Sequence, residues 1–293
     1  MLDLSDKYYK SKVSLITLEG KDSLLYLQEL TTNNITNLQP NFVKITLLLN
    51  ESGGLIDVLY VFNYDNQENK IIIAYSHNEE KVVRYLENNI NNKDIVISKM
   101  TENYYKVLLL SYNTYSICAD LGLKIPVADK FTHNENCISF YDEINESVCI
   151  LIPESKMTEF NSKAKKYIEL NTNDFNYYRI TRRIPQHPYE INESIKPESC
   201  NLDIYLNRKT INTNEEENDI ILRNEMHCFS SYSELNPEDL IYNNDNNCGF
   251  ISSVAIKDNI HYCLAFISPF DIKIKDKYYT KIKSEKNFLN FII

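Results

Sequence analysis

The sequence predicts an α+β fold in which a β/α layer occurs twice and a small β-barrel follows toward the C-terminal end. Three observations favour this fold. Strand-like and helix-like apolar patterns recur in the same order in two consecutive segments of about 100 residues each. A polar, irregular stretch runs from about residue 185 to residue 217. Short strand-like runs dominate beyond it, as is typical of a small barrel or sandwich.

The two segments have closely similar predicted elements. In the first segment, alternation predicts strands, and a capped apolar stripe predicts each helix. Its elements are strand 12–18, helix 24–30, strands 43–49, 55–62 and 70–76, a helix after residue 78, and strand 94–100. The second segment has strand 105–112, helix 115–123, strands 137–141 and 147–152, helix 156–168 and helix 175–183.

Both segments follow the order β-α-β-β-α-β, which predicts a duplicated ferredoxin-like layer. We therefore predict a domain over residues 1–217 with pseudo-repeats at about 10–100 and 104–200, followed by a β-barrel over residues 218–293. The barrel strands are expected at 220–222, 249–254, 261–267 and 270–274. Such short strands are not stable in isolation, so a closed arrangement is the natural one. The alternative is one irregular α/β domain.

Composition narrows the class of protein. The formal net charge is -10, which argues against broad, sequence-independent binding of nucleic acid. No apolar run is long enough to cross a bilayer, and the first residues do not resemble a signal peptide, so a cytoplasmic location is expected, with the mitochondrial matrix as the alternative. The seven cysteines include no CxxC pair, which predicts free, buried thiols and no metal site.

Two motifs near the N-terminus carry a family resemblance. Residues 26–35, YLQELTTNNI, resemble the F-L-Q-x-L-T-T-N-D-I signature of the glycine-cleavage T-protein superfamily. Residues 47–57, LLLNESGGLID, resemble its L-L-N-x-x-G-G-x-x-D hairpin. That superfamily includes folate-dependent aminomethyltransferases and the YgfZ branch of folate-binding proteins. The resemblance implies two ferredoxin-like domains and a small barrel around a folate-sized opening.

Later motifs resemble the YgfZ branch. The segment RITRRIP at 179–185 is similar to R-I-x-x-G-I-P, with Arg183 in the place of the glycine. Residues 197–203 resemble P-x-E-x-x-L-D, and 249–253 with 264–267 resemble two strands of the family barrel. The hallmark K-G-C-Y-x-G-Q-E finds its best match at 209–216, where only Lys209 and the final glutamate agree. The missing cysteine leaves no thiolate there.

The resemblance implies a set of folate-binding candidates. Asp57 is the candidate catalytic residue, because a carboxylate near the folate could polarise the transferred group; a strand residue facing solvent is the alternative. The cofactor-binding candidates are Asn33, Asp57, Arg179, Arg183, Glu190 and Lys209. Asn33 could instead cap or turn the chain. Arg179, Arg182 and Arg183 are spaced at i, i+3 and i+4 and are expected on one helix face. They could bind the anionic tail of a folate, or they could be cations that stabilise a helix C-terminus.

Three functions follow from the resemblance. The first is a YgfZ-like protein that binds tetrahydrofolate and supports iron–sulfur cluster maintenance or cluster-dependent tRNA modification, with iron–sulfur proteins or radical tRNA-modifying enzymes as partners. The second is an aminomethyltransferase. Thr181 stands where those enzymes have a folate-binding glutamate, and Val58 stands where they have a second aspartate, which weakens this alternative. The third is a degenerate scaffold, which the altered segment 209–216 favours.

Overall fold

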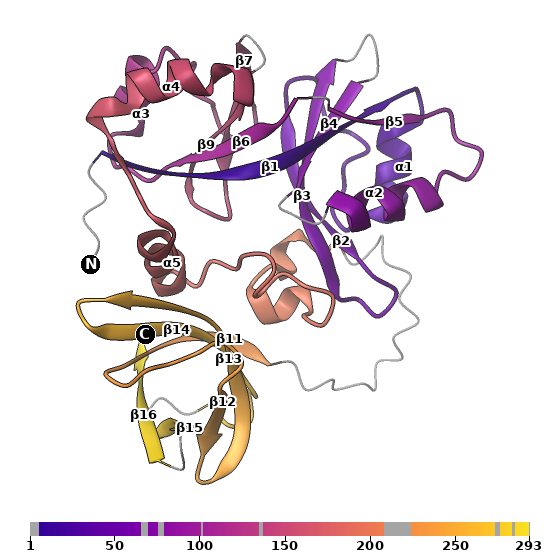
Figure 1. Cartoon of the computed structure of the whole chain (residues 1–293). Coiled ribbons are helices and arrows are strands. Elements are labelled where there is room, and N and C mark those ends of the chain that lie inside the picture. The colour runs from indigo at the N-terminus through magenta and orange to yellow at the C-terminus, as the bar shows by residue number, and fades with distance from the viewer. Residues whose placement is uncertain are drawn as a thin grey trace. The chain divides into compact units, whose positions relative to one another are not determined.

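The computed structural model of the chain describes residues 6–65, 70–75, 79–100, 102–134, 137–207, 224–272, 276–282 and 285–292 (Figure 1). The chain forms two compact units. Unit 1 comprises the described parts of Met1–Leu170 and Tyr205–Ile211. Unit 2 comprises those of Asn171–Ile204 and Asn212–Ile293. No helix among these described residues has the length and apolar character needed to cross a membrane.

Unit 1 contains two β/α layers. The elements of the first layer are β1 (Lys7–Glu19), α1 (Ser23–Leu30), β2 (Val43–Leu49), β3 (Leu55–Asp65), β4 (Lys70–Tyr75), α2 (Glu79–Asn88) and β5 (Val96–Lys99). Those of the second are β6 (Tyr104–Leu109), α3 (Thr114–Asp120), β7 (Thr132–Asn134), β8 (Cys137–Asp142), β9 (Ser147–Pro153), α4 (Met157–Lys163) and β10 (Ile168–Glu169).

The strands of both layers join through β1 into one sheet. The order along the sheet is β2-β3-β4-β1-β6-β9-β8-β7, with β5 and β10 also paired to β1. The C-terminal half of β1, from Ser14 to Glu19, pairs with β4 and with β5. Its N-terminal half, from Lys7 to Val13, pairs with β6 and with β10. A single long strand therefore contributes to both layers, as Figure 1 shows.

Each layer has its own apolar core between helices and sheet. In the first, Tyr26, Leu27, Val82 and Leu86 of the two helices are fully buried together with Ile16 and Leu18 of β1 and neighbouring strand residues. In the second, Ile117 and Phe160 pack with the buried faces of β6 and β9. Burial of these side chains is the main stabilising contribution, because apolar area leaves water.

Gly20 lies at the entrance to α1 and explains why this position needs glycine. Its φ is +132°, and a Cβ built there would lie 2.1 Å from the carbonyl oxygen of Asp94. Only a residue without a side chain fits so close to another backbone.

Unit 2 is a closed six-stranded barrel with one helix beside it. Its elements are α5 (Thr172–Thr181), a 3-10 helix at Pro197–Cys200, and strands β11 (Glu225–Ser231), β12 (Leu240–Asn243), β13 (Asn246–Lys257), β14 (Ile260–Ile267), β15 (Tyr278–Ile282) and β16 (Glu285–Ile292). The barrel closes in the order β11-β14-β13-β12-β15-β16. Asn173 of α5 exchanges two hydrogen bonds with the Ile256 backbone of β13, at 2.7 and 2.9 Å.

The predicted fold class is confirmed, with local corrections. The single helix expected over 156–168 is wrong: two 3-10 turns, Glu154–Lys156 and Ala164–Lys166, flank α4, and β10 follows. The strand expected at 270–274 is wrong for Phe270–Ile272, which form a turn. The predicted strand at 220–222 lies outside the described residues. None of the seven cysteines forms a disulfide bond, as predicted, and six of them are buried, whereas Cys137 is partly exposed.

Candidate functional site

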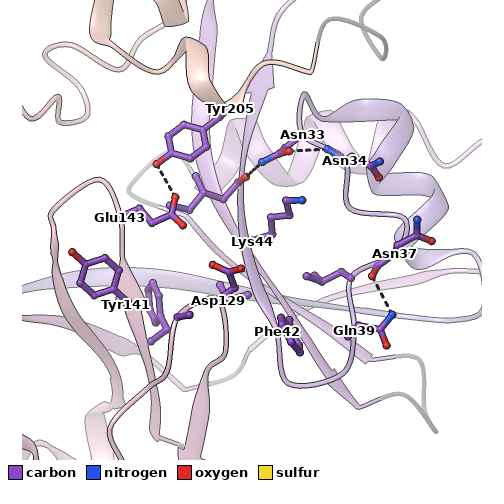
Figure 2. A pocket seen from close by; sticks show the side chains of 15 residues that line it. Asn33, Asn34, Asn37, Gln39, Phe42, Lys44, Asp129, Tyr141, Glu143 and Tyr205 are labelled. Carbon is purple, nitrogen blue, oxygen red and sulfur yellow. Dashed lines mark hydrogen bonds between the residues drawn. The ribbon is translucent and has the colours of Figure 1, made fainter.

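A polar groove lies along strand β2 of unit 1, and we call it the β2 groove (Figure 2). Its volume is about 420 Å³, within the range typical of small-molecule sites. It is lined by Asn33, Asn34, Asn37, Leu38, Gln39, Phe42, Val43, Lys44, Ile45, Ala128, Asp129, Phe140, Tyr141, Glu143 and Tyr205. Amide side chains and aromatic rings together suit a flat or extended ligand that has hydrogen-bonding groups.

Asn33 forms one end of the β2 groove and holds the turn after α1. Its Nδ2 donates to the carbonyl oxygen of Ile45 at 2.8 Å, and its Oδ1 accepts from the backbone N–H of Asn34 at 2.8 Å. Its own N–H donates to Thr46 Oγ1 at 2.9 Å. Asn33 therefore stabilises a turn, as one of its two predicted roles required, and it also lines the β2 groove.

Tyr205 closes another side of the same groove. Its hydroxyl donates to Glu143 Oε2 at 3.3 Å, and its carbonyl oxygen accepts from Thr32 Oγ1 at 2.8 Å. The segment at 205–207 is held further by the Asn207 N–H, which donates to the Thr32 carbonyl at 2.9 Å. Burial and the charge of Glu143 raise the pKa of the Tyr205 phenol. It remains a neutral donor in the physiological range.

Asp57 lies in β3, directly after the paired glycines, and its side chain is fully buried. Its Oδ1 accepts a hydrogen bond from the Val58 N–H at 2.8 Å. The chain is irregular here, because the pairing of β2 with β3 shifts between Leu48 and Leu49. The alternative of a strand residue that faces solvent is therefore wrong. Asp57 does not line the β2 groove.

A buried polar network lies close to Asp57 and joins the two layers. Tyr60 of β3 donates to Asp142 Oδ1 at 2.9 Å, and Lys106 of β6 lies 2.7 Å from Asp142 Oδ2. The Lys106 amine also donates to the Tyr60 hydroxyl at 3.2 Å. Asn145 Nδ2 donates to Asp142 Oδ2 at 2.8 Å. The Asp142 carboxylate is thus buried but fully hydrogen-bonded, as a buried charge must be.

The pKa values in this network shift together. For Lys106, burial alone would lower the pKa, but the nearby Asp142 carboxylate raises it on balance, with smaller contributions from Cys149 and Asp57. For Tyr60, burial and the Asp142 charge raise the pKa well above its usual value. The network therefore holds one ammonium, one carboxylate and one neutral phenol. A cationic lysine cannot act as a nucleophile, so its role is electrostatic.

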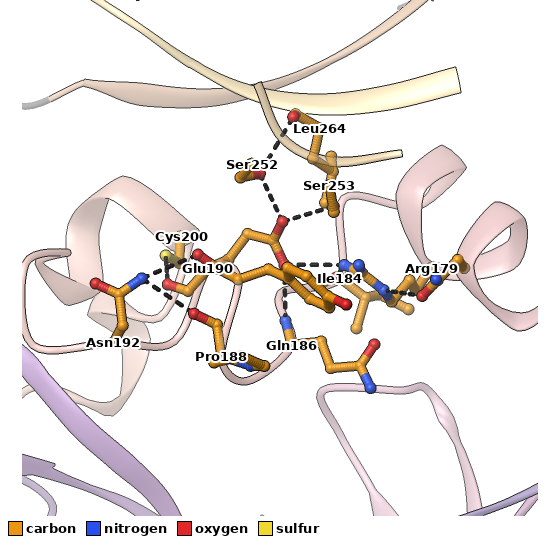
Figure 3. A network of polar contacts seen from close by, with 12 residues as sticks. Arg179, Ile184, Gln186, Pro188, Glu190, Asn192, Cys200, Ser252, Ser253 and Leu264 are labelled. Atoms are coloured by element: carbon orange, nitrogen blue, oxygen red, sulfur yellow. Dashed lines mark hydrogen bonds and ion pairs between the residues drawn. The ribbon is translucent and has the colours of Figure 1, made fainter. Parts of the chain in front are cut away.

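A second buried network lies in unit 2 around Glu190 (Figure 3). Arg179 Nη1 lies 2.9 Å from Glu190 Oε2, and Ser252 and Ser253 donate to Glu190 Oε1 at 2.5 and 2.6 Å. The Gln186 N–H donates to Glu190 Oε2 at 3.1 Å. Both charged side chains are fully buried. This arrangement ties α5 and the following loop to the barrel strand β13.

The predicted arginine face does not form. Helix α5 ends at Thr181, and Arg183 has a φ of +56°, so the three arginines diverge. Arg179 points to Glu190, Arg182 stacks on the Tyr178 ring at 4.3 Å, and Arg183 donates to the Ile292 carbonyl at 3.3 Å. The expectation that they share one helix face is therefore wrong. The physical reason is the left-handed turn at the position where the family motif has glycine.

The structure thus distributes the predicted site residues. Asn33 and Asp57 belong to unit 1, and Arg179, Arg183 and Glu190 belong to unit 2. Lys209 lies outside the described residues, and the roles of all six toward folate stay predictions. Sequence reasoning missed Tyr60, Lys106 and Asp142. A lysine inside the apolar strand 104–109 was the one local signal. Among the described residues, no group of three His, Cys, Asp or Glu could hold a metal ion.

Comparisons with known proteins find one family model and several aminomethyltransferases that each match a part of this chain. Residues 10–111 match the family model of the GCVT N-terminal domain. The aminomethyltransferase of Staphylococcus carnosus is 28% identical over 94 residues, which are 32% of this chain and 26% of that protein. The aminomethyltransferase of Caldanaerobacter subterraneus subsp. tengcongensis is 32% identical over 92 residues, which are 31% of this chain and 24% of that protein. The match spans about a quarter of the length of these curated relatives.

A solved structure extends the likeness to the whole fold. The glycine cleavage system aminomethyltransferase T from Bartonella henselae superposes with a TM-score of 0.81. The superposition covers 97% of this chain and 84% of that chain, at 12% sequence identity. Identity this low shows the fold alone. Residues 10–111 therefore resemble the GCVT N-terminal domain, and the chain has the fold of the glycine cleavage system aminomethyltransferase T.

Proposed function

We propose that this chain is a YgfZ-like tetrahydrofolate-binding protein that supports iron–sulfur cluster maintenance or cluster-dependent tRNA modification. The T-protein fold over 97% of the chain supports folate as the ligand. Asp57 is kept after the paired glycines and is buried in β3. A buried carboxylate is able to accept a hydrogen bond from a pterin or to polarise a bound one-carbon group.

One observation favours folate binding without aminomethyl transfer. Thr181 occupies the position of the glutamate in the resemblance to aminomethyltransferases, and its hydroxyl donates to the carbonyls of Tyr177 and Tyr178, at 2.9 and 3.1 Å. No carboxylate is present there, and Val58 supplies none after Asp57. We therefore place folate binding without aminomethyl transfer first.

The test is calorimetric titration with tetrahydrofolate and with its 5-formyl derivative. We expect saturable binding, and we expect Asp57→Asn to weaken it severalfold. Asp258→Asn, an exposed aspartate in the β13–β14 turn, is the matched control and should bind as the parent does. Thermal unfolding of each variant separates loss of binding from loss of fold. If neither folate binds at hundreds of micromolar, the degenerate scaffold becomes the favoured function.

The cellular role has its own measurement. In cells from which this chain has been removed, the activity of a cluster-dependent tRNA-modifying enzyme should fall, and the intact chain should restore it. If Asp57→Asn restores activity as well as the intact chain does, folate binding at that residue plays no part in the role.

The second candidate is an aminomethyltransferase, and the curated relatives with that name favour it. An exchange assay with a lipoylated carrier protein tests it directly. Measurable turnover would reverse the order of the two candidates.

A further inference from the structure

Strand β2 is the terminal strand of the sheet, and its outer edge is only partly covered. At one end, the Val43 N–H donates to the Asp129 carbonyl at 2.8 Å. At the other end, the Thr32 N–H donates to the Leu47 carbonyl at 3.2 Å, and the Leu47 N–H donates to Thr32 Oγ1 at 3.2 Å. Two segments far apart in the sequence therefore cover the two ends of this edge.

Between these segments the edge has a gap. Along a strand, the backbone groups of alternate residues point to the same edge, so Val43, Ile45 and Leu47 point outward. The Ile45 carbonyl accepts a hydrogen bond from Asn33 Nδ2 at 2.8 Å. The Ile45 N–H and the Val43 carbonyl have no hydrogen bond to any part of the chain that the structure describes. Both residues line the β2 groove.

This donor and acceptor are spaced for one residue of a parallel strand. In parallel pairing, a residue of one strand lies opposite a residue of the next strand. Its N–H donates to the carbonyl of the residue that precedes this opposite residue, and its carbonyl accepts from the N–H of the residue that follows it. Here the opposite residue is Lys44, the acceptor is the Val43 carbonyl and the donor is the Ile45 N–H. Peptides that add to a sheet edge use this kind of main-chain pairing.

The charged side chains of the β2 groove lie on different sides of it. The Lys44 amine points toward Asn33 and Asn34 in Figure 2, and it has no ion-pair partner among the described residues. Asp129 and Glu143 lie on the other side, and neither forms an ion pair with a described residue. Asp129 lies at the start of β2, because its carbonyl accepts from the Val43 N–H, whereas Glu143 is bonded to Tyr205. A ligand that runs parallel to β2 would therefore meet the Asp129 carboxylate near its start and the Lys44 ammonium toward its end.

We propose that the β2 groove binds a short peptide with free termini, extended parallel to β2. The central residue donates its N–H to Val43 and accepts from Ile45. The terminal ammonium faces Asp129, and the terminal carboxylate faces Lys44. The rings of Phe42, Tyr141 and Tyr205 contact the side chains, and a volume of about 420 Å³ suits about three residues. Peptide binding here is independent of folate binding.

The probe is trialanine, titrated by calorimetry against the whole chain. Three derivatives report on each contact: the N-acetylated peptide, the C-amidated peptide and a peptide with an N-methyl group on the central amide. We expect trialanine to bind, and each derivative to bind about tenfold more weakly, because each loses one charge-assisted or main-chain contact.

Two variants locate the contact. Lys44→Met should weaken trialanine about tenfold but leave the C-amidated peptide unchanged, because its partner charge is already absent. Lys12→Met, an exposed lysine on β1, is the control and should change neither. The Ile45 amide resonance should shift on titration in the parent chain. Circular dichroism of both variants confirms that they fold.

Three outcomes would overturn the proposal. The first is no binding of trialanine at about 1 mM, far above the concentration at which a built site should fill. The second is binding that ignores the blocked termini and Lys44→Met. The third is displacement of the peptide by tetrahydrofolate, which would make the β2 groove the folate site. Failure of tetrahydrofolate to bind at all would leave the peptide result unaffected.

Discussion

Arg179 Nη1 lies 2.9 Å from Glu190 Oε2 in unit 2, and neither side chain is exposed to solvent. Glu190 also accepts hydrogen bonds from Ser252 and Ser253 of β13. A buried pair of this kind adds little net stability over an apolar pair, but removal of one partner leaves an uncompensated charge. The pair therefore holds α5 on the barrel and makes each residue intolerant of single replacement.

Replacement of Arg179 by methionine should destabilise the protein by about 3–5 kcal/mol, because Glu190 would stay buried and unpaired. The double change Arg179→Met with Glu190→Leu should cost less than the sum of the two single changes. Urea unfolding measures both. Arg182→Met, which loses only a ring contact with Tyr178, is the control and should cost about 1 kcal/mol or less. Strict additivity of the two single changes would show that the pair is not coupled.

The Tyr60–Lys106–Asp142 network predicts a loss of stability in alkali. The folded-state pKa of Lys106 and that of Tyr60 are both raised above the values of the unfolded chain. Their contribution is therefore complete below the unfolded pKa values, near 10, and is lost as pH rises through the folded values. The free energy of unfolding should fall above a pH of about 10.

Tyr60→Phe provides the comparison for this pH dependence. Its decline in alkali should be shallower than that of the parent chain, because one proton no longer contributes. Tyr105→Phe, a tyrosine on β6 outside the network, is the control and should follow the parent. Equal slopes for Tyr60→Phe and the parent would remove the network as the cause.

The backbone conformation of Arg183 predicts that glycine is preferred over alanine at this position. Its φ of +56° is costly for a residue with a Cβ, by about 1–2 kcal/mol. Both Arg183→Gly and Arg183→Ala lose the hydrogen bond to the Ile292 carbonyl, so their difference isolates the backbone. The glycine variant should be more stable than the alanine variant by about 1 kcal/mol, measured by urea unfolding. An equal stability of the two would show that the turn relaxes at no cost.

Cys137 should be the one cysteine that reacts readily in the native protein. It is partly exposed, whereas the other six thiols are buried. Burial raises the pKa of Cys118 and of Cys248 to about 11, so these thiols are protonated and slow to react. A thiol-reactive dye should label one site quickly under native conditions and seven in denaturant. Cys137→Ser should abolish the fast phase, and a fast phase that survives would point to local opening elsewhere.

Local patterns in the sequence predicted the sheet of unit 1 well. Strands 43–49 and 55–62 are rich in apolar residues, and Asn50 stabilises the turn between them, because its Oδ1 accepts from the Ser52 and Gly54 N–H groups. Gly53 takes a φ of +78°, which suits glycine. Such short-range signals also place the first helix.

Contacts between segments far apart in the chain could not be predicted from the sequence. Strand β10 pairs in parallel with Lys7 and Tyr8 of β1, which no local pattern near residue 168 indicates. The network of Tyr60, Lys106 and Asp142 joins strands from both layers, so its members share no motif. Arg183 is an intermediate case, because the family motif marked a glycine position and the positive φ explains it.

The long strand β1 has a consequence for the ancestry and engineering of unit 1. Its first seven residues, Lys7 to Val13, lie in the second layer, although they precede the whole of the first layer in the chain. A cut between the layers, near residue 102, would leave β6 without β1 as a neighbour, although β6 would keep β9, and would leave the first seven residues of β1 without β6 and β10. The second layer thus depends on seven residues that are synthesised before the first layer, and a fragment that begins near residue 102 lacks one strand of its sheet.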